Sequence, residues 1–474
     1  MKDKSNQHKN GMSRRKFLGT ASCAALGSTT MLSSILNLGV LNSLAGMSVP
    51  TYKEDKTYKA LICVLLAGGN DSYNMLVPRN GSHYTDYATT RSNLALGQGD
   101  LLPINFTDTS GKQFGLHPSM PEVQSLFNSN KLAFVSNVGT MIQPTTMSQY
   151  QNGISVPLGL FSHADQIQQW QTSIPHTRSA VGWGGRIADI LHAGNGNQNV
   201  SMNITVSGSN IFQIGNSVTE YAIRAAAGGS VGINVYDSTN PVDQFLKTGV
   251  ESLLNQQYND IFRSTYANKI KNSQSYHDQF NLAIAGAPTL NTTFSPNYVS
   301  KNMEMIAKTI SARNLLNVNR QTFFVTYGGW DHHDNLIDNQ TDMFSVLSAA
   351  LGELETALQE MGVFNDVTTF TISDFARSLT SNGNGSDHAW GGNAMVMGGS
   401  VNGGQVYGTY PSLAYGGPND VGGGIMLPTT AVDEYFAEIS EWFGISATDL
   451  PYVLPNIGNF YSPGTGGPIG FMNI

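Results

Sequence analysis

The chain has 474 residues, of which 40% are hydrophobic and 12% are charged, so it can form one large domain or two ordinary ones with a substantial core. Its 25 basic and 33 acidic residues give a net charge of −8. Six of the basic residues and one of the acidic residues lie before residue 46, so residues 46–474 carry a net charge of about −13. An acidic chain without a Lys/Arg stripe lacks the electrostatic footprint of nucleic-acid binding, and it also lacks a polybasic membrane patch.

The N-terminal segment has the composition of an export signal. SRRKFLG places paired arginines before an uncharged run of Ala, Leu, Gly, Ser and Thr, and Ser43-Leu44-Ala45 ends this run in a small-x-small arrangement. Paired arginines followed by Lys, Phe and Leu are typical of twin-arginine export. Gly and polar residues are too frequent in the run for a transmembrane helix. We therefore predict a signal peptide over residues 1–45, recognition by the twin-arginine export machinery, and a periplasmic or secreted location.

Five apolar runs of strand length follow in chain order, and they lie at Lys59–Leu66, Lys131–Val138, Gln321–Tyr327, Val367–Ile372 and Ala394–Met397. Between them lie candidate helices at Pro121–Ser129, Ala164–Gln171, Asn302–Leu316 and Thr341–Met361. Runs that are apolar on both faces and separated by helices are typical of a parallel sheet with helices on both sides. The sequence therefore predicts an α/β fold with a doubly wound, mostly parallel sheet.

Between about residues 194 and 296 the apolar pattern weakens into Asn, Gly, Ser and Thr, with one helical stretch near residues 250–285. We interpret this segment as a cap region inserted into one domain that spans residues 46–474.

Acidic residues and histidines gather where the predicted strands end. They are Asp71 after the first run, Asp331 and His333 after the third, and Asp374, Asp387 and His388 after the fourth. The carboxyl ends of parallel strands meet at one edge of a sheet, so we expect these side chains to lie close together. Such groups repel and desolvate one another unless a cation lies among them, and mixed oxygen and nitrogen ligands suit zinc, manganese or iron. Taken singly, each is more simply a turn residue, a helix cap or a solvated histidine.

Seven segments resemble, in order, the blocks of the domain of unknown function 1501 family. They are GGNDSYNMLVP, FGLHPSMPEVQSL, LAFVSNVGT, FSHADQIQQWQT, VGWGGRIAD, VTYGGWDHHDN and TISDFARSLTSNGNGSDHAWGG. The resemblance covers about residues 59–411, and the family is grouped with the alkaline phosphatase and sulfatase superfamily. It therefore implies an alkaline-phosphatase-like fold, one or two divalent metal ions, and hydrolysis of an anionic phosphate or sulfate ester. It also implies an exported protein as a partner.

The superfamily pattern assigns metal-ligand roles to five positions: Asp71, Asp331, His333, Asp374 and His388. One departure stands out, because Asp374 is followed by Phe375 where the pattern has a histidine. His163, His117 or Asp387 fills the resulting gap, or a single metal ion binds.

The resemblance also assigns catalytic roles. The superfamily nucleophile lies at a helix N-terminus, which corresponds to Ser162, with Thr145 and Thr146 as weaker candidates. Arg377 and Arg186 are candidates to hold the anionic group of the substrate.

Two functions remain open. One is a metal-dependent hydrolase, which the five matching acidic and imidazole positions favour. The other is a catalytically inactive relative that acts as a periplasmic binding or assembly module, which the missing histidine after Asp374 favours. A redox enzyme is excluded, because the chain has 2 Cys, of which Cys23 leaves with the signal, and no dinucleotide-binding motif.

Overall fold

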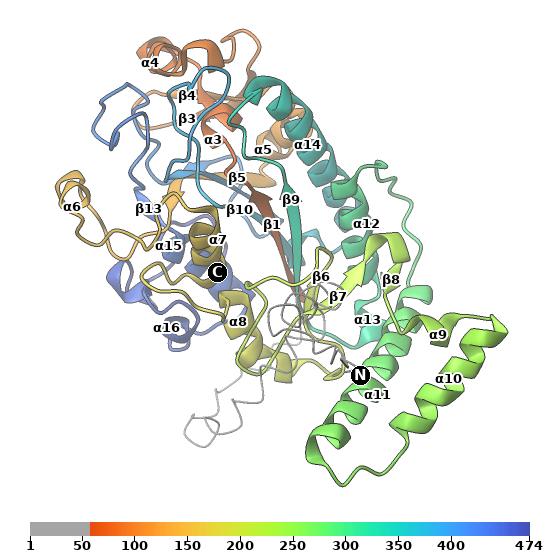
Figure 1. Cartoon of the computed structure of the whole chain (residues 1–474). Helices are drawn as coiled ribbons and strands as arrows, with labels where there is room; N and C mark the ends of the chain where they lie inside the picture. Colours follow the sequence, from red (N-terminus) through yellow and green to blue (C-terminus); the bar gives the residue numbers. More distant parts are fainter. Residues whose placement is uncertain (1–56) are drawn as a thin grey trace, which may run out of the picture. The chain divides into compact units, whose positions relative to one another are not determined.

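The computed structural model describes residues 57–474, and the predicted signal peptide and twin-arginine motif lie outside the described residues. In this part of the chain, ten strands form one sheet (Figure 1). At its centre β1 (Lys59–Ala67) pairs in parallel with both β10 (Val367–Ser373) and β9 (Arg320–Gly328). On the far side of β10, β11 (Gly392–Met397) is antiparallel and leads to β5 (Leu132–Gly139).

The remaining strands extend both edges of this sheet. Beyond β9 lie β6 (Asn203–Thr205), β7 (Tyr221–Arg224) and β8 (Gly229–Ser230), and beside β5 lie β12 (Val406–Tyr407) and β13 (Thr430–Ala431). A separate three-stranded sheet contains β2 (Leu76–Pro78), β4 (Gln113–Leu116) and β3 (Leu102–Thr107).

Strand β1 shows why the main sheet is covered on both faces. Alternate residues of the strand enter two different hydrophobic cores, with Ile62 and Val64 in one and Leu61 and Cys63 in the other. The first core includes side chains of α5 (Pro121–Asn128), α12 (Tyr298–Ser311) and α14 (Leu336–Glu360). The second includes side chains of α7 (His163–Thr172), α8 (Trp183–Leu191), α15 (Val432–Phe443) and α16 (Leu450–Val453). The predicted α/β fold, with a mostly parallel sheet and helices on both faces, is confirmed.

The other helices are α3 (Ser72–Met75), α4 (Gly81–Arg91), α6 (Met147–Gln151), α9 (Asn234–Asp237), α10 (Pro241–Leu254), α11 (Ile261–Ala285) and α13 (Arg313–Leu316). Segment 194–296, predicted as a cap, supplies strands β6 to β8 to the sheet and helices α9 to α11. The helix predicted over Asn302–Leu316 is divided into α12 and α13, and the stretch near residues 250–285 contains the end of α10 and the whole of α11. Among the described helices, none combines the length and apolar character needed to cross a membrane.

Candidate metal site

The site lies at the sheet edge where β1, β9 and β10 end. Because β11 is antiparallel to β10, its first residues lie at this same edge. Asp331 and His333 follow β9, Asp374 follows β10, and His388 precedes β11. The strand ends therefore deliver the predicted acidic and imidazole groups to one place, as the topology of an open α/β sheet requires.

Gly68, directly after β1, lets two of these strand ends approach each other. Its φ of 119° is a conformation that side chains disfavour, and a Cβ added there would lie 2.5 Å from the backbone nitrogen of Asp331. The Gly68 amide donates a hydrogen bond to Asp374 Oδ1 at 3.1 Å. The turn after β1 thus holds the carboxylate that follows β10.

His388 reaches the site on the loop that joins β10 to β11. Two short backbone segments of this loop run antiparallel, with a bridge between Arg377 and His388. The Ala389 amide donates to the Ala376 carbonyl at 2.8 Å, and the Ser378 amide donates to the Asp387 carbonyl at 2.9 Å. Pairing of the loop with itself explains how a Gly- and Asn-rich segment can place an imidazole reproducibly.

His163 comes from a different part of the chain, the first turn of α7. Ser162 is the N-cap residue of this helix. Trp170, near the other end of the helix, packs edge-on against Phe436 of α15, with ring centroids 6.0 Å apart. Burial of this tryptophan anchors α7 beneath the site edge and aims its N-terminal residue toward the strand ends.

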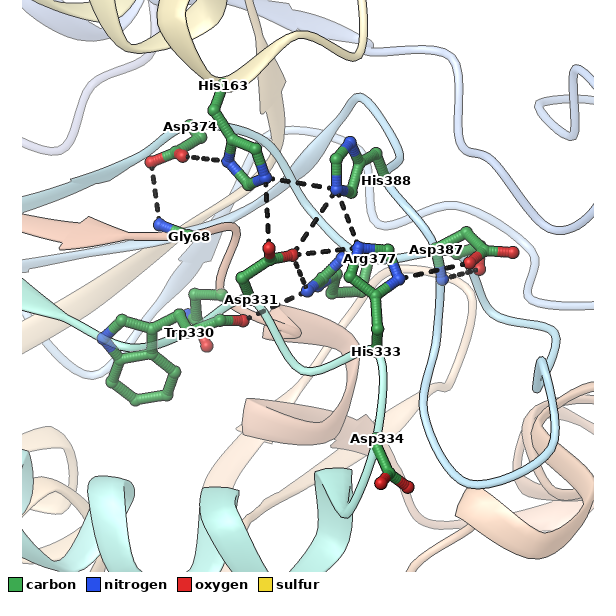
Figure 2. Close-up of polar contacts among 12 residues, drawn as sticks. Gly68, His163, Trp330, Asp331, His333, Asp334, Asp374, Arg377, Asp387 and His388 are labelled. Carbon is green, nitrogen blue, oxygen red and sulfur yellow. Dashed lines mark hydrogen bonds and ion pairs between the residues drawn. The ribbon is translucent and has the colours of Figure 1, made fainter.

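Three imidazoles and one carboxylate converge at this edge (Figure 2). His388 Nε2 lies 3.1 Å from His163 Nε2 and 3.0 Å from His333 Nε2. The carboxylate oxygens of Asp331 lie 3.5 Å from His163 Nε2, 3.1 Å from His333 Nε2 and 3.4 Å from His388 Nε2. We call these four residues the His–Asp cluster.

Oxygen atoms on the outer side of each ring determine which ring nitrogen faces the cluster. His163 Nδ1 lies 2.6 Å from Asp374 Oδ2, and His388 Nδ1 lies 2.8 Å from the carbonyl oxygen of Phe161. A carbonyl oxygen can only accept, so His388 Nδ1 carries the proton and its Nε2 presents a lone pair. His333 Nδ1 faces Asp387 Oδ1 at 3.4 Å. Each ring therefore turns Nδ1 outward to an oxygen and Nε2 inward.

Inward lone pairs at these separations need a positive charge between them. Neutral Nε2 atoms 3.0–3.1 Å apart repel each other unless a proton or a metal ion lies between them. Tetrahedral ligands bound at 2.0–2.1 Å from a zinc ion would lie about 3.3–3.4 Å apart. His163 Nε2, His388 Nε2 and the Asp331 carboxylate lie 3.1–3.5 Å apart, close to this value, and these three residues form a group whose ligand atoms could share one ion. His333 Nε2 lies 3.0 Å from His388 and 3.1 Å from Asp331 but is not part of that group. The donor set therefore fits a divalent metal such as zinc, manganese or iron.

Charge and burial set the protonation of these groups. Burial alone would raise the pKa of Asp331, but the Arg377 guanidinium, with His163 and His333, outweighs it and lowers the pKa, so this carboxylate stays ionised. Burial lowers the pKa of His388, which favours the neutral ring that a metal requires. Burial raises the pKa of Asp374, against hydrogen bonds from His163 and Gly68.

Four of the five predicted metal ligands lie together. Asp331, His333 and His388 belong to the His–Asp cluster, and Asp374 touches it through His163. Asp71 is fully buried, and its Oδ2 pairs with Nη2 of the equally buried Arg91. The other oxygen of Asp71, Oδ1, is buried without a hydrogen-bond partner in the described part of the chain, and Asp71 as a metal ligand stays a prediction.

The predicted catalytic residues are separated. Arg377 is fully buried, and its Nη2 donates to Asp331 Oδ1. Arg186 donates to the carbonyl oxygens of Val453, Val181 and Thr172. All three nitrogens of Arg186 are thus engaged within the fold, whereas Nε and Nη1 of Arg377 are buried without a hydrogen-bond partner among the described residues. Ser162 precedes His163, and its hydroxyl interacts with the Asp165 carboxylate.

His163 is the central residue that sequence reasoning named only as one of three replacements for a missing ligand. The available signal was its place directly after Ser162, a helix N-cap candidate, in a chain with few histidines. Phe375, which stands where the superfamily pattern has a histidine, packs against the rings of His163 and His388 with centroid distances of 4.8 and 4.5 Å. Of the alternatives, Asp387 lies behind His333, and His117 packs against Phe344.

The fold and the site define an α/β protein with a histidine–carboxylate cluster at the carboxyl edge of a mostly parallel sheet. The model of one family, described as "Protein of unknown function (DUF1501)", matches residues 58–445. The chain belongs to this family. No curated protein matches its sequence.

Several solved structures are similar to this chain. A sulfatase from Pseudoalteromonas sp., PsFucS1, has a TM-score of 0.33 and 10% identity, with 87% of this chain and 71% of that chain covered. The soluble domain of lipooligosaccharide phosphoethanolamine transferase A from Neisseria meningitidis has a TM-score of 0.31 and 9% identity, with 82% and 88% covered. The C-terminal periplasmic domain of EcEptC from Escherichia coli, in complex with Zn, has a TM-score of 0.30 and 7% identity, with 73% and 74% covered. Similarity at this level transfers no activity, substrate or metal to this chain.

Proposed function

We propose that the protein binds one divalent transition-metal ion through the His–Asp cluster and uses it to hydrolyse an anionic ester, phosphate or sulfate, after export to the periplasm or beyond. The observation that carries the proposal is the convergence of His163 Nε2, His388 Nε2 and the Asp331 carboxylate at separations of 3.1–3.5 Å, with His333 Nε2 3.0 Å from His388 beside them. When bound, the metal would supply a Lewis acid that polarises an ester oxygen. The remaining contributions come from the protein's own side chains.

The protein holds the ligands in place through a second set of contacts. Asp374 and the Phe161 carbonyl hold the outer nitrogens of His163 and His388, which orients both rings. Arg377 holds the Asp331 carboxylate and keeps it ionised. The cluster remains open to solvent on one side, since the side chains of Asp331 and His333 are both 46% exposed. An ester group can therefore approach the ligands from that side.

A single ion fits the contacts better than two. The two oxygens of Asp374 already accept from the Gly68 amide and face His163 Nδ1. Asp71 pairs with Arg91. The described residues contain one group of histidine and acidic ligand atoms close enough to share an ion, and we propose that one ion binds there.

The candidate nucleophile is either Ser162 or water. Ser162 lies at the N-terminus of α7, where the helix dipole favours a developing negative charge. Its hydroxyl interacts with the Asp165 carboxylate, so attack by Ser162 would require this contact to break. This contact favours water as the nucleophile.

A second candidate function has its own supporting observation. Arg186 is not free to bind an anionic substrate, because all three of its nitrogens donate to backbone carbonyls, and Nη2 of Arg377 is held by Asp331. A metal-holding binding or assembly module, with an exported protein as a partner, does not need an arginine that binds such a substrate. We propose it as the alternative.

Metal analysis with parallel hydrolysis assays distinguishes the two functions. We expect close to one zinc, manganese or iron ion per chain in protein purified without chelator, and a loss of that ion in His163→Ala and His388→Ala. His176→Ala, which removes an exposed histidine, should keep the ion. Turnover of p-nitrophenyl phosphate or p-nitrophenyl sulfate that needs the ion would support the hydrolase, and Ser162→Ala would show whether the serine is the nucleophile. Metal without turnover would support the binding module. Folded protein without metal would exclude both.

A further inference from the structure

Helices α10 and α11 carry an apolar surface that the described part of the chain leaves uncovered. Both helices extend away from the central sheet (Figure 1, green). No residue of α10 is buried. Seven large apolar side chains on α10 and the first two turns of α11 are between 49% and 78% exposed, and they are Val242, Phe245, Leu246, Leu253, Ile261, Phe262 and Tyr266. We call this surface the hairpin face.

The hairpin face is continuous from one helix to the other. Leu253 of α10 and Tyr266 of α11 line the same groove, together with Val250, Leu254 and Ile270. Seven side chains of this size and exposure present on the order of 800 Å² of surface, which is the area that each partner contributes to a standard protein–protein interface. Val242, Phe245, Leu246 and Leu253 all lie on one side of α10 at 3.6 residues per turn, so the exposed apolar surface of this helix is contiguous.

The residues of α10 on this face can pair with the same residues on a second copy of the helix. Phe245 precedes Gly249 by four residues and Leu253 follows it by four, so the three lie in one row along the helix. Nothing lies within 4 Å of a Cβ added at Gly249, so the middle of the row is a shallow, open position. In an antiparallel pair of α10 helices centred on Gly249, Phe245 of one copy meets Leu253 of the other. The two helices then approach each other closely at Gly249, with large residues on either side. The arrangement is the same for both copies, as a two-fold interface requires.

The charge of this segment favours binding to a second copy of the chain over binding to an anionic membrane. Lys247 lies over the ring of Tyr236 at 5.0 Å, and Asp243 accepts a hydrogen bond from Ser238, so these charges point toward the α9 side of the helix. Residues 241–271 contain four basic and three acidic residues, whereas the whole chain carries a net charge of −8. Two copies that meet at this face therefore avoid the like-charge repulsion that the rest of the acidic surface would impose. An anionic membrane would attract a basic cluster, and the hairpin face has none.

We propose that the hairpin face is the interface of a homodimer, in which α10 of one copy packs antiparallel against α10 of a second copy about Gly249. The interface does not depend on the metal site or on the proposed hydrolysis.

Sedimentation of the purified full chain between 1 and 100 μM tests the dimer, since interfaces of standard area have dissociation constants from about micromolar to picomolar. We expect a mass near twice 50.9 kDa at the upper concentrations. Phe245→Asp should raise the dimer dissociation constant at least about tenfold. Gly249→Leu should do the same while the monomer stays folded, because the added side chain enters open space and leucine favours helix over glycine.

The matched control is Leu282→Asp, since Leu282 is 77% exposed and Phe245 is 78% exposed, but Leu282 lies near the other end of α11. It should leave the dimer intact. A chain that is monomeric throughout, or a dimer that both Phe245→Asp and Gly249→Leu leave unchanged, would overturn the proposal. Equal dissociation by Leu282→Asp would overturn it too. Co-sedimentation of a monomeric chain with vesicles of phosphatidylglycerol and phosphatidylcholine, abolished by Phe245→Asp, would assign the face to a membrane instead.

Discussion

His163 Nδ1 lies 2.6 Å from Asp374 Oδ2, and Asp374 is 1% exposed. A buried carboxylate beside the outer nitrogen of an imidazole fixes the tautomer and the orientation of the ring. Asp374 was predicted as a direct metal ligand. We propose a different role, in which Asp374 holds His163 while His163 contributes Nε2 to the cluster.

Asp374→Asn should therefore weaken metal binding without abolishing it. We expect the affinity for zinc to fall about 10–100-fold, because the amide still fits the space but no longer holds the ring through a charged acceptor. His163→Ala should remove binding altogether, since it deletes the ligand. Titration of apo-protein with zinc against a competing chelator measures both. Equal loss in the two variants would instead identify Asp374 as a ligand.

Asp71→Asn should damage folding more than metal binding. Asp71 and Arg91 are both fully buried and pair with each other, and Arg91 Nη1 also donates to the Ser378 carbonyl at 3.0 Å. Removing one charge of a buried pair leaves the other uncompensated and costs about 3–5 kcal/mol. Chemical denaturation measures this cost.

Metal content separates this role of Asp71 from that of a ligand. We expect Asp71→Asn to keep its metal at a temperature where it is folded. A stable variant that had lost metal would show that Asp71 contributes to the site and that the pairing with Arg91 is incidental.

The sheet was predictable because its strands are apolar on both faces, as β1 shows by dividing its residues between two cores. No direction was predicted for β11. Its antiparallel direction was predictable, because the loop between β10 and β11 contains no helix and a parallel crossover normally needs one. Strands β6 and β7 are too short to produce a periodic signal, and they lie in a segment rich in Asn, Gly and Ser. The sequence pattern therefore predicted the central strands of the sheet but not its edge strands.

The site was predictable where residues follow strands and unpredictable where tertiary packing decides. Asp331, His333 and His388 could be grouped because the ends of neighbouring strands must meet. His163 follows a long connection after β5, and the packing of α7 against α8, α15 and β10 places it at the edge. The pairing of Asp71 with Arg91 depends on where α4 ends in space, which no spacing in the sequence encodes.

Asp433 should make stability depend on pH far from the metal site. Burial raises the pKa of Asp433 to about 7, against partial compensation from Ser173, its own backbone amide and Arg186. In the unfolded chain the pKa of an aspartate is about 3.9. The folded state therefore binds more protons between pH 4 and 7, and the free energy of unfolding falls as pH rises through this window by up to about 1.4 kcal/mol per pH unit.

Asp433→Asn lacks this titration. The difference in free energy of unfolding between the variant and the native chain should move in favour of the variant from pH 4 to pH 7, and then level off. Urea denaturation at a series of pH values measures it, with the exposed Asp100→Asn as a control for the change of net charge. A difference that stays flat across the window would show that Asp433 does not titrate there.

Removal of the metal should lower thermal stability only when the His–Asp cluster is intact. An ion that binds the folded chain alone stabilises it by about 2.7 kcal/mol at a free concentration of 100 times its dissociation constant. For a chain of this length that corresponds to a shift in Tm of about 3 °C. We expect a chelator to lower Tm by this order in the native chain and in His176→Ala, and to leave the Tm of His388→Ala unchanged. If the chelator lowered the Tm of His388→Ala equally, the stabilising ion would be bound elsewhere, because His388 Nε2 lies 3.0–3.4 Å from donors on His163, His333 and Asp331 and every arrangement of the cluster around an ion includes it.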